Sequence, residues 1–521
     1  MLVARASRII AFTLLLGAVA ASQVAPLAGL DDYISQAMAT FQVPGLAIAV
    51  VKDGKVVLAK GYGVRKLGEP TKVDQRSLFG IGSNTKAFTT AALAMLVDEG
   101  KIGWDDRVVE RLPGFQMYDP YVTHEMTIRD LLTHRSGMGL GEGDLLVFPP
   151  SDLTSAQIIE KLRYMKPVSS FRSKYAYDNL LYMVAGEIIP AVTAKPWRDT
   201  IRERIFNPLE MSDSNTSVRE FGPGVNFATP HSMVEGKLTP IALERIDNIA
   251  PAGAINSSVS DMAKWILAQL DRGAIGGTTR RLFSEAQNRE MWSPQTILPV
   301  SEPPPALAAS RTNFAAYGLG WGLTEYRGRK YVGHSGGVSG YVSQVALIPE
   351  MKLGVVVLTN QDAVGILPSV TRRVLDRYLG AADYDWAKAY VDLAEKEKSD
   401  AAEIEKKQAA ARPAHSKPSL PLEKYAGAYA DAWYGAIDIA FEGGKLVMRF
   451  SHSPALTGDL EHWQYDTFKV RWRDRSLDAD AFVTFSLNSE GGIKEVTMKP
   501  VSPLTDFSFD FQDLNIVPRQ K

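Results

Sequence analysis

The chain has 521 residues, of which 45% are hydrophobic and 22% are charged, and this composition excludes a disordered chain and a multispan membrane protein. Its 58 basic and 59 acidic residues leave a formal net charge of −1, so we expect no nucleic acid and no anionic membrane surface as partner. Because cysteine is absent, the sequence excludes disulfides, thiolate zinc sites, iron–sulfur clusters, a cysteine nucleophile and a lipoprotein anchor.

The start of the chain has the pattern of a cleavable secretory signal. Two arginines precede an apolar run at 9–20 that is too short to span a bilayer and that ends in small residues. We therefore expect a signal peptide at 1–20, export to the periplasm or the medium, and no transmembrane anchor after cleavage. An uncleaved N-terminal anchor is the alternative.

Residues 21–385 are predicted to form one α+β domain. Strands are predicted at 46–51, 55–58, 342–348 and 353–358. An alanine-rich helix is predicted at 83–98, and helices alternate with loops rich in Gly and Pro in the middle of the region. Strands at both ends and helices between them indicate an antiparallel sheet that the N- and C-terminal strands complete together.

A charged, helical linker is predicted at 386–420, where an alanine-rich charged run is followed by three prolines. Beyond it, hydrophobic residues alternate with period two, for example at Phe507, Phe509 and Phe511, and glycine pairs separate the runs. Residues 421–515 are therefore expected to form a small all-β barrel or sandwich of short strands, those three phenylalanines included.

The strongest chemical signal is Ser83-Asn84-Thr85-Lys86, which is the only S-x-x-K in the chain. Side chains three residues apart share one face of a helix, so the Lys86 amine can lie beside the Ser83 hydroxyl. An amine whose pKa is lowered by burial can take the proton of the serine and make it a nucleophile. The alternative is an N-capping serine followed by a surface lysine.

A second signal is Tyr177-Asp178-Asn179, which precedes a predicted helix at 180–189. A tyrosine whose pKa is lowered by a lysine ammonium can shuttle protons, and an asparagine can hydrogen-bond an amide of a substrate. The alternative is a loop tyrosine packed on the core next to an N-capping asparagine.

A third signal is Gly333-His334-Ser335-Gly336-Gly337, with apolar strand-like residues on both sides. Consecutive glycines let a strand edge approach a ligand and present backbone N–H groups to it. The stretch also matches G-x-S-x-G, the nucleophile elbow of α/β-hydrolases, with Ser335 as nucleophile. That interpretation requires a turn and a helix after Ser335, whereas the residues after Gly337 favour a strand.

Three motifs occur in order within one domain: Ser83-x-x-Lys86, Tyr177-x-Asn179 and His334-Ser335-Gly336. Together they resemble the serine β-lactamase and penicillin-binding protein superfamily, and more narrowly the class C β-lactamase-like hydrolases, or S12 peptidases. The resemblance covers most of 42–380 and includes Ala252-Gly253-Ala254-Ile255. Residues 422–511 are similar to a lipocalin-like barrel that some members carry.

The resemblance implies a serine hydrolase that needs neither metal nor cofactor. Ser83 would form an acyl-enzyme, while Lys86 and Tyr177 would manage protons during acylation and activate water for deacylation. The backbone N–H groups of Ser83 and Gly337 would form the oxyanion hole.

Asn179, His334, Ser335 and Gly336 are the substrate-binding residues that the resemblance implies. β-Lactamases and transpeptidases often have Lys-Thr-Gly where this chain has His334-Ser335-Gly336. A histidine is mostly uncharged at neutral pH, so recognition of a free carboxylate is expected to be weaker. Small amides, peptides (including peptides with D-residues) and esters are therefore the leading substrates, and a genuine β-lactamase or DD-carboxypeptidase is an alternative.

Two further alternatives belong to other functional classes. In the first, the same pocket belongs to a catalytically silent sensor of peptidoglycan fragments or peptides. In the second, the C-terminal domain has the main role, binding lipid or a partner or assembling a homo-oligomer.

Overall fold

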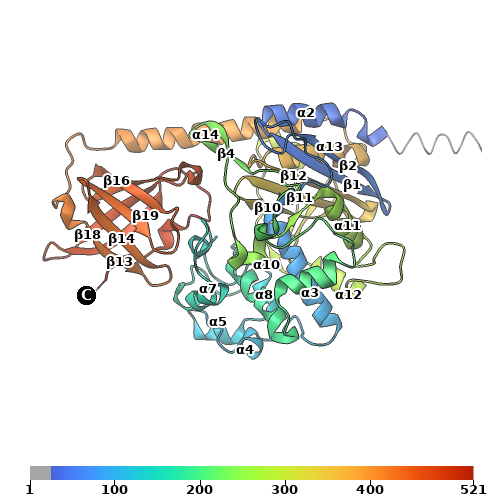
Figure 1. Cartoon of the computed structure of the whole chain (residues 1–521), viewed down its shortest axis with the longest axis horizontal. Helices are drawn as coiled ribbons and strands as arrows, with labels where there is room; N and C mark the ends of the chain where they lie inside the picture. The colour runs from blue at the N-terminus through green and yellow to red at the C-terminus, as the bar shows by residue number, and fades with distance from the viewer. Residues whose placement is uncertain (1–24, 520–521) are drawn as a thin grey trace, which may run out of the picture.

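The computed structural model describes residues 25–519, so the predicted signal peptide lies outside the described residues. The chain forms an α+β domain and an all-β barrel, which are joined by the long helix α14 (Trp386–Ala410) (Figure 1). The expected fold class is confirmed. Within the described part of the chain, none of the helices combines the length and the apolar character that a bilayer crossing requires.

An eight-stranded antiparallel sheet is the centre of the first domain. Its strands, in spatial order, are β2 (Lys55–Gly63), β1 (Gly45–Lys52), β12 (Leu353–Thr359), β11 (Tyr341–Ile348), β10 (Arg329–Val338), β9 (Gly322–Tyr326), β8 (Ala315–Tyr317) and β7 (Thr296–Ile297). Because β1 pairs with β12, strands from both ends of the domain meet in the sheet, as the sequence predicts.

Helices cover both faces of this sheet (Figure 1). Side chains alternate along β1, so Leu46, Ile48 and Val50 face one hydrophobic cluster, whereas Ala47 and Ala49 face another. The first cluster includes residues of α2 (Leu30–Thr40) and α13 (Ile366–Leu379), and the second includes residues of α3 (Thr85–Asp98), α8 (Leu180–Thr193) and α11 (Val259–Leu270).

Shorter elements complete the domain. The remaining helices are α4 (Val108–Arg111), α5 (Pro120–Glu125), α6 (Ile128–Leu131), α7 (Ser155–Lys161), α9 (Trp197–Ile201), α10 (Ala250–Gly253) and α12 (Glu285–Met291). Two small antiparallel pairs are β3 (Phe79–Gly80) with β6 (Asn256–Ser257) and β4 (His231–Val234) with β5 (Lys237–Pro240).

The C-terminal domain is a nearly closed antiparallel barrel. Its strands, in spatial order, are β19 (Ile493–Pro500), β18 (Ala481–Leu487), β17 (Thr467–Trp472), β16 (Thr457–Gln464), β15 (Lys445–Phe450), β14 (Gly435–Glu442), β13 (Gly427–Asp431) and β20 (Val517–Pro518). A bridge between Val496 and Ile516 brings the two edges of the sheet together. Aromatic side chains pack inside it, with the rings of Trp472 and Phe511 stacked 5.7 Å apart.

The expectation of a strand through Phe507, Phe509 and Phe511 is wrong. Residues 501–510 form an irregular loop, and Phe511 begins a short 3₁₀ turn. The alternation of phenylalanines has another cause, because successive side chains of this loop pack against two different domains. Phe511 is buried in the barrel, whereas Phe507 contacts the α+β domain.

Candidate active site

Ser83 lies where a 3₁₀ turn, η2 (Gly82–Asn84), leads into α3. It is partly exposed, while Lys86, one turn further on, is completely buried. The Lys86 ammonium Nζ lies 2.9 Å from Ser83 Oγ. The spacing of the motif therefore brings the two side chains together as the sequence predicts.

Three oxygens surround the Lys86 amine. Besides Ser83 Oγ, they are Asn179 Oδ1 at 2.7 Å and the carbonyl oxygen of Ala252 at 3.1 Å. Burial lowers the pKa of Lys86 to about 7, against the opposing effect of the nearby carboxyls of Asp144 and Asp178. A large fraction of the amine is thus neutral near pH 7, and a neutral amine can accept a proton from Ser83.

Tyr177 lies over the same amine, with the centre of its ring 4.8 Å from Lys86 Nζ. Burial raises the pKa of Tyr177 well above its usual value, although a hydrogen bond with Ser83 opposes the shift. The expectation that lysine lowers the pKa of this tyrosine is wrong, because desolvation has the largest effect on the pKa and raises it. Tyr177 is therefore a neutral phenol that can donate a proton, and Lys86 is the group suited to accept one.

The start of α8 leaves the Asn179 side chain free for the site. Asp178 Oδ1 accepts the N–H of Leu181 at 3.0 Å and so caps the helix. Asn179 instead accepts a hydrogen bond from Lys86, and its Nδ2 donates to Asp144 Oδ2 at 2.9 Å. Asn179 stands at the N-cap position of α8, but its side chain makes no capping hydrogen bond, so the capping role predicted in that alternative is wrong.

The glycines of the third motif let strand β10 approach Ser83. A Cβ added to Gly336 would lie 2.0 Å from the Ile81 carbonyl oxygen and 2.8 Å from Ser83 N, so only glycine fits there. One residue further along, Gly337 N would lie 2.6 Å from a Cβ added to Gly82. The backbone of β10 is thus packed against the turn that carries Ser83, and this contact sets the Ser83 and Gly337 N–H groups close together.

The elbow interpretation of Ser335 is wrong. Residues 333–337 lie inside β10, which pairs with β9 on one side and with β11 on the other. A nucleophile elbow requires a sharp turn from a strand into a helix, whereas here a second strand follows. Ser335 is exposed on the strand and lines the cavity described below.

His334 is held as a neutral group. Burial and the Lys86 cation lower the pKa of His334 to about 4. Its Nε2 lies 2.8 Å from the hydroxyl of Tyr317, which comes from β8. The imidazole therefore supplies no positive charge at neutral pH, in agreement with the expectation from the sequence.

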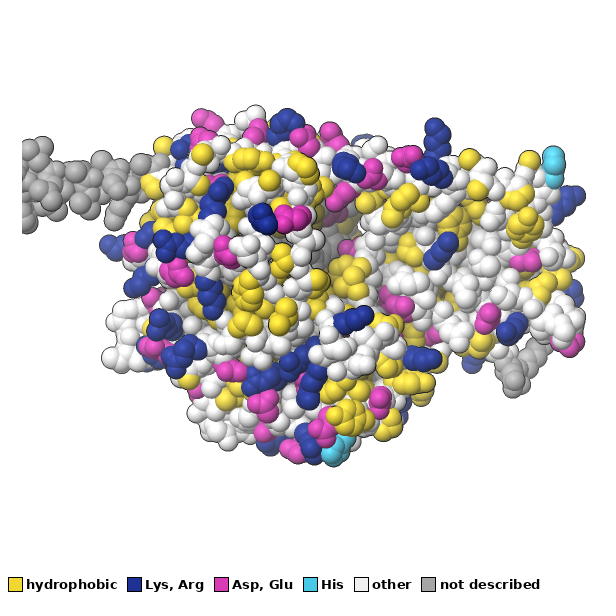
Figure 2. Space-filling model, turned by 180° about the vertical axis from the view of Figure 1, so that it is seen from behind, with side chains coloured by type: hydrophobic (Ala, Val, Ile, Leu, Met, Phe, Trp, Pro, Cys, Tyr) yellow, Lys and Arg dark blue, Asp and Glu magenta, His cyan; other side chains and the backbone are white. Residues whose placement is uncertain are grey.

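Ser83 lines a cavity of about 740 Å³, together with Tyr177, Asn179 and residues 333–342. Residues of the barrel also line it, namely Ser476, Leu477 and residues 506–509. No Lys or Arg is among its described lining residues, whereas three acidic residues are: Glu244, Asp362 and Asp506. On the face shown in Figure 2, the surface is hollowed between the two domains and hydrophobic side chains border the hollow.

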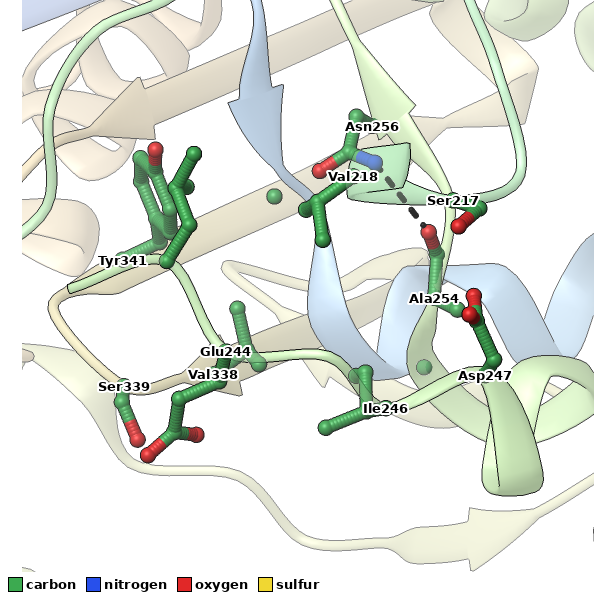
Figure 3. A pocket seen from close by; sticks show the side chains of 13 residues that line it. Ser217, Val218, Glu244, Ile246, Asp247, Ala254, Asn256, Val338, Ser339 and Tyr341 are labelled. Carbon is green, nitrogen blue, oxygen red and sulfur yellow. Dashed lines mark hydrogen bonds between the residues drawn. The ribbon is translucent and has the colours of Figure 1, made fainter. Parts of the chain in front are cut away.

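A smaller pocket adjoins this cavity and shares Glu244, Val338 and Ser339 with it. Figure 3 shows the Glu244 carboxyl near the Ser339 side chain. One carboxyl oxygen, Glu244 Oε2, is buried and has no hydrogen-bond partner. This oxygen is an acceptor that a substrate N–H could use.

Asp144, Tyr317 and the barrel residues 506–509 also belong to the site, and none of them was predicted from the sequence. Asp144 lies in the segment between Gly137 and Pro150, which carries no recognisable motif. No local pattern distinguishes these residues, because their roles depend on contacts across the fold. Among residues 25–519, no group of three or more His, Asp or Glu side chains could hold a metal ion.

The fold and the Ser83–Lys86 pair define a class of protein, the serine hydrolases of the β-lactamase and penicillin-binding protein fold. The Beta-lactamase family model matches residues 30–377, and a "Domain of unknown function (DUF3471)" matches residues 411–518. The chain belongs to the beta-lactamase family, with a DUF3471 domain as its C-terminal barrel.

Individual proteins are similar to this chain in sequence or in fold. The unguisins hydrolase ungD′ of Aspergillus campestris is 31% identical over 441 residues, which are 80% of this chain and 78% of that protein. The octameric penicillin-binding protein homologue from Pyrococcus abyssi has a TM-score of 0.61 at 24% identity, over 94% of this chain and 99% of that one. The D-amino acid amidase from Ochrobactrum anthropi SV3 has a TM-score of 0.55 at 25% identity, over 68% and 99%.

Proposed function

We propose that the protein is an exported serine hydrolase that acts through a Ser83 acyl-enzyme on small amides, peptides or esters. The observation that carries the proposal is the buried Lys86 amine, 2.9 Å from Ser83 Oγ and with a pKa lowered to about 7. The alternative of a surface lysine does not fit a side chain with no exposed surface. Export rests on the pattern of residues 1–20 alone.

Acylation follows from the positions of these groups. Ser83 Oγ attacks the substrate carbonyl carbon while its proton passes to Lys86 Nζ, and the backbone N–H groups of Ser83 and Gly337 donate to the resulting oxyanion. Collapse of the tetrahedral intermediate breaks the bond to the leaving group. The Tyr177 phenol donates its proton to that group and regains one from the Lys86 ammonium.

Deacylation runs through the same residues. A water molecule attacks the acyl carbon and gives a proton to Lys86, and a second collapse breaks the bond between the acyl carbon and Ser83 Oγ. That oxygen regains a proton from the Lys86 ammonium, either directly or through the Tyr177 phenol, which is reprotonated by Lys86, so the site returns to its starting state.

The charge of the cavity narrows the substrate class. His334 is neutral, and none of the described lining residues is Lys or Arg. A substrate carboxylate next to the scissile bond would therefore have no cation to pair with in the lining, apart from Lys86 when it is protonated. Glu244, Asp362 and Asp506 favour N–H donors or an amine. We therefore propose neutral or amine-bearing acyl donors, which include D-residue amides and peptides; the names unguisins hydrolase and D-amino acid amidase support this class.

Two alternatives remain to be tested. A β-lactamase or DD-carboxypeptidase acts on a substrate with a free carboxylate, so the lack of a cation in the lining disfavours it. A silent sensor needs no nucleophile, and the intact Ser83–Lys86–Tyr177 constellation disfavours it.

The first experiment is intact-protein mass spectrometry after exposure to a fluorophosphonate, on the wild-type protein, Ser83→Ala and Ser335→Ala. We expect one adduct on the wild type and on Ser335→Ala and none on Ser83→Ala. An adduct that depends on Ser335 would refute the mechanism. An unlabelled wild type would favour the silent sensor.

A further inference from the structure

The loop that follows β19 leaves the barrel and contacts the catalytic domain. Asp510 is completely buried, and its two carboxyl oxygens accept the N–H groups of Gly143 at 2.6 Å and Leu145 at 3.1 Å. Both donors flank Asp144. The barrel therefore fixes the backbone on each side of this residue.

Ser508 continues the same contact toward the active site. Its hydroxyl donates to Asp144 Oδ2 at 2.9 Å, and the same oxygen accepts from Asn179 Nδ2, also at 2.9 Å. Asn179 Oδ1 in turn accepts from Lys86 Nζ at 2.7 Å. An unbroken chain of hydrogen bonds thus leads from the barrel to the proposed base.

Phe507 contacts Tyr177 directly. The two rings meet edge to face with centres 6.1 Å apart. Gly141 lies under Phe507, because an added Cβ would be 2.6 Å from its ring, and the Gly141 N–H donates to the carbonyl of Tyr177. The ring is nevertheless 42% exposed, and it lines the cavity together with Ser508 and Phe509.

We propose that the loop 506–510 of the DUF3471 domain is part of the active site, with Ser508 as a positioning residue and Phe507 as a specificity-determining residue. Ser508 acts through Asp144 to hold Asn179 and thereby Lys86. Phe507 forms an apolar wall beside Tyr177 that favours substrates with an apolar group at this place. The inference rests on the proposed function and gives the domain a role in the same reaction.

The contact has features that mere domain packing does not require. A loop that only holds the domains together would not need the Ser508 hydroxyl to bond Asp144, a carboxyl that is also bonded to Asn179. Nor would it need the half-exposed Phe507 ring in the wall of the cavity. In both cases the barrel side chain meets a residue of the reacting constellation or its immediate partner.

The test compares full-length Ser508→Ala and Phe507→Ala with matched controls from the same domain. Ser489→Ala removes an exposed hydroxyl in the turn between β18 and β19, and Phe441→Ala removes a ring that is 37% exposed and absent from the cavity lining. Ser508→Thr keeps the hydroxyl. Melting temperature and fluorophosphonate labelling of Ser83 show that each variant is folded and retains its nucleophile.

For Ser508→Ala we expect kcat on para-nitrophenyl acetate to fall about tenfold, as loss of one part-buried hydrogen bond to a carboxyl predicts. The acidic limb of the pH profile should move to lower pH, because the hydroxyl favours the ionised form of Asp144 and that carboxylate raises the pKa of Lys86. Ser508→Thr should restore most of the rate. A purely structural residue would lower stability without moving this limb.

For Phe507→Ala we expect KM for para-nitrophenyl butyrate to rise at least threefold relative to that for the acetate, with both kcat values nearly unchanged. The inference is overturned if Ser508→Ala and Phe507→Ala behave like Ser489→Ala and Phe441→Ala. Failure of wild-type labelling would instead refute the proposed function, so the two failures are distinguishable.

Discussion

Lys86 is the residue whose environment decides what the site can do. A buried amine beside a serine is a base only if its pKa is low, and burial and the carboxyls act in opposite directions on it. Burial has the larger effect, which leaves the amine near half-protonation at neutral pH. Tyr177 shows the same dominance of burial, which keeps its phenol protonated.

The pH profile is the first prediction at this scale. Since Lys86 must be neutral to accept the Ser83 proton, kcat/KM for a neutral ester should rise with pH through an apparent pKa of about 7. Asp144→Asn removes a carboxylate that raises the pKa of Lys86, so this limb should move by about one unit to lower pH. Steady-state kinetics between pH 5 and 9 measure the shift.

The matched control for this prediction is Asp438→Asn, which neutralises an exposed carboxylate on the barrel strand β14. Its limb should coincide with that of the wild type. A limb that stays in place in Asp144→Asn would show that Asp144 does not act on the proton-accepting group.

Elements that local patterns determine could be predicted, and elements that depend on distant contacts could not. The apolar runs of β1 and β12 and the helical spacing of Ser83 and Lys86 are local, and all were predicted. The hydrogen bond from Ser508 to Asp144 joins residues 364 positions apart, and no sequence pattern signals it. The alternation at Phe507 was misleading, because a loop between two bodies can bury aromatic side chains in both.

At the scale of elements, the close approach of β10 to η2 is the feature most sensitive to substitution. In Gly336→Ala, the new methyl group would lie 2.0 Å from the Ile81 carbonyl oxygen, so the strand must move away from Ser83. We expect a loss of stability of about 1–3 kcal/mol, typical of overpacking, and a strongly reduced rate of fluorophosphonate labelling. Thermal unfolding and labelling kinetics measure the two effects.

Gly337→Ala provides the stability control on the same strand. An added Cβ there meets no atom within 4 Å, so the free energy of unfolding should stay within about 0.5 kcal/mol of the wild-type value. Equal stability of the two variants would mean that β10 does not press against η2 as described.

At the scale of the whole molecule, the interface between the domains concentrates carboxyl groups. Glu142 and Asp144 lie on the catalytic-domain side and Asp510 and Asp513 on the barrel side, while Asp178 is buried within the catalytic domain next to the active-site residues Tyr177 and Asn179. Burial raises the pKa of all five, to about 7 for Glu142 and Asp144 and to about 6 for Asp178. The docked and folded state therefore holds protons that the unfolded chain releases near pH 4.

The sign of the resulting pH dependence follows from linkage. Between about pH 4 and pH 7 the folded state binds more protons through these carboxyls than the unfolded state does, so their contribution to stability falls as pH rises through this window. The buried His134 and the partly exposed His334 act in the opposite direction, because desolvation lowers the pKa of each and the unfolded chain takes up their protons below about pH 6.5. A wild-type profile alone mixes the two effects.

A comparison with Asp144→Asn separates them. The variant keeps both histidines but cannot ionise at position 144, so its melting temperature relative to the wild type should increase from pH 5 to pH 7. Each kcal/mol of difference corresponds to about 2–4 °C in a domain of moderate size. Asp438→Asn should run parallel to the wild type across the same range. A constant offset for Asp144→Asn would mean that this carboxyl is already ionised at pH 5, and the barrel would then dock against a fixed negative charge instead of a titrating one.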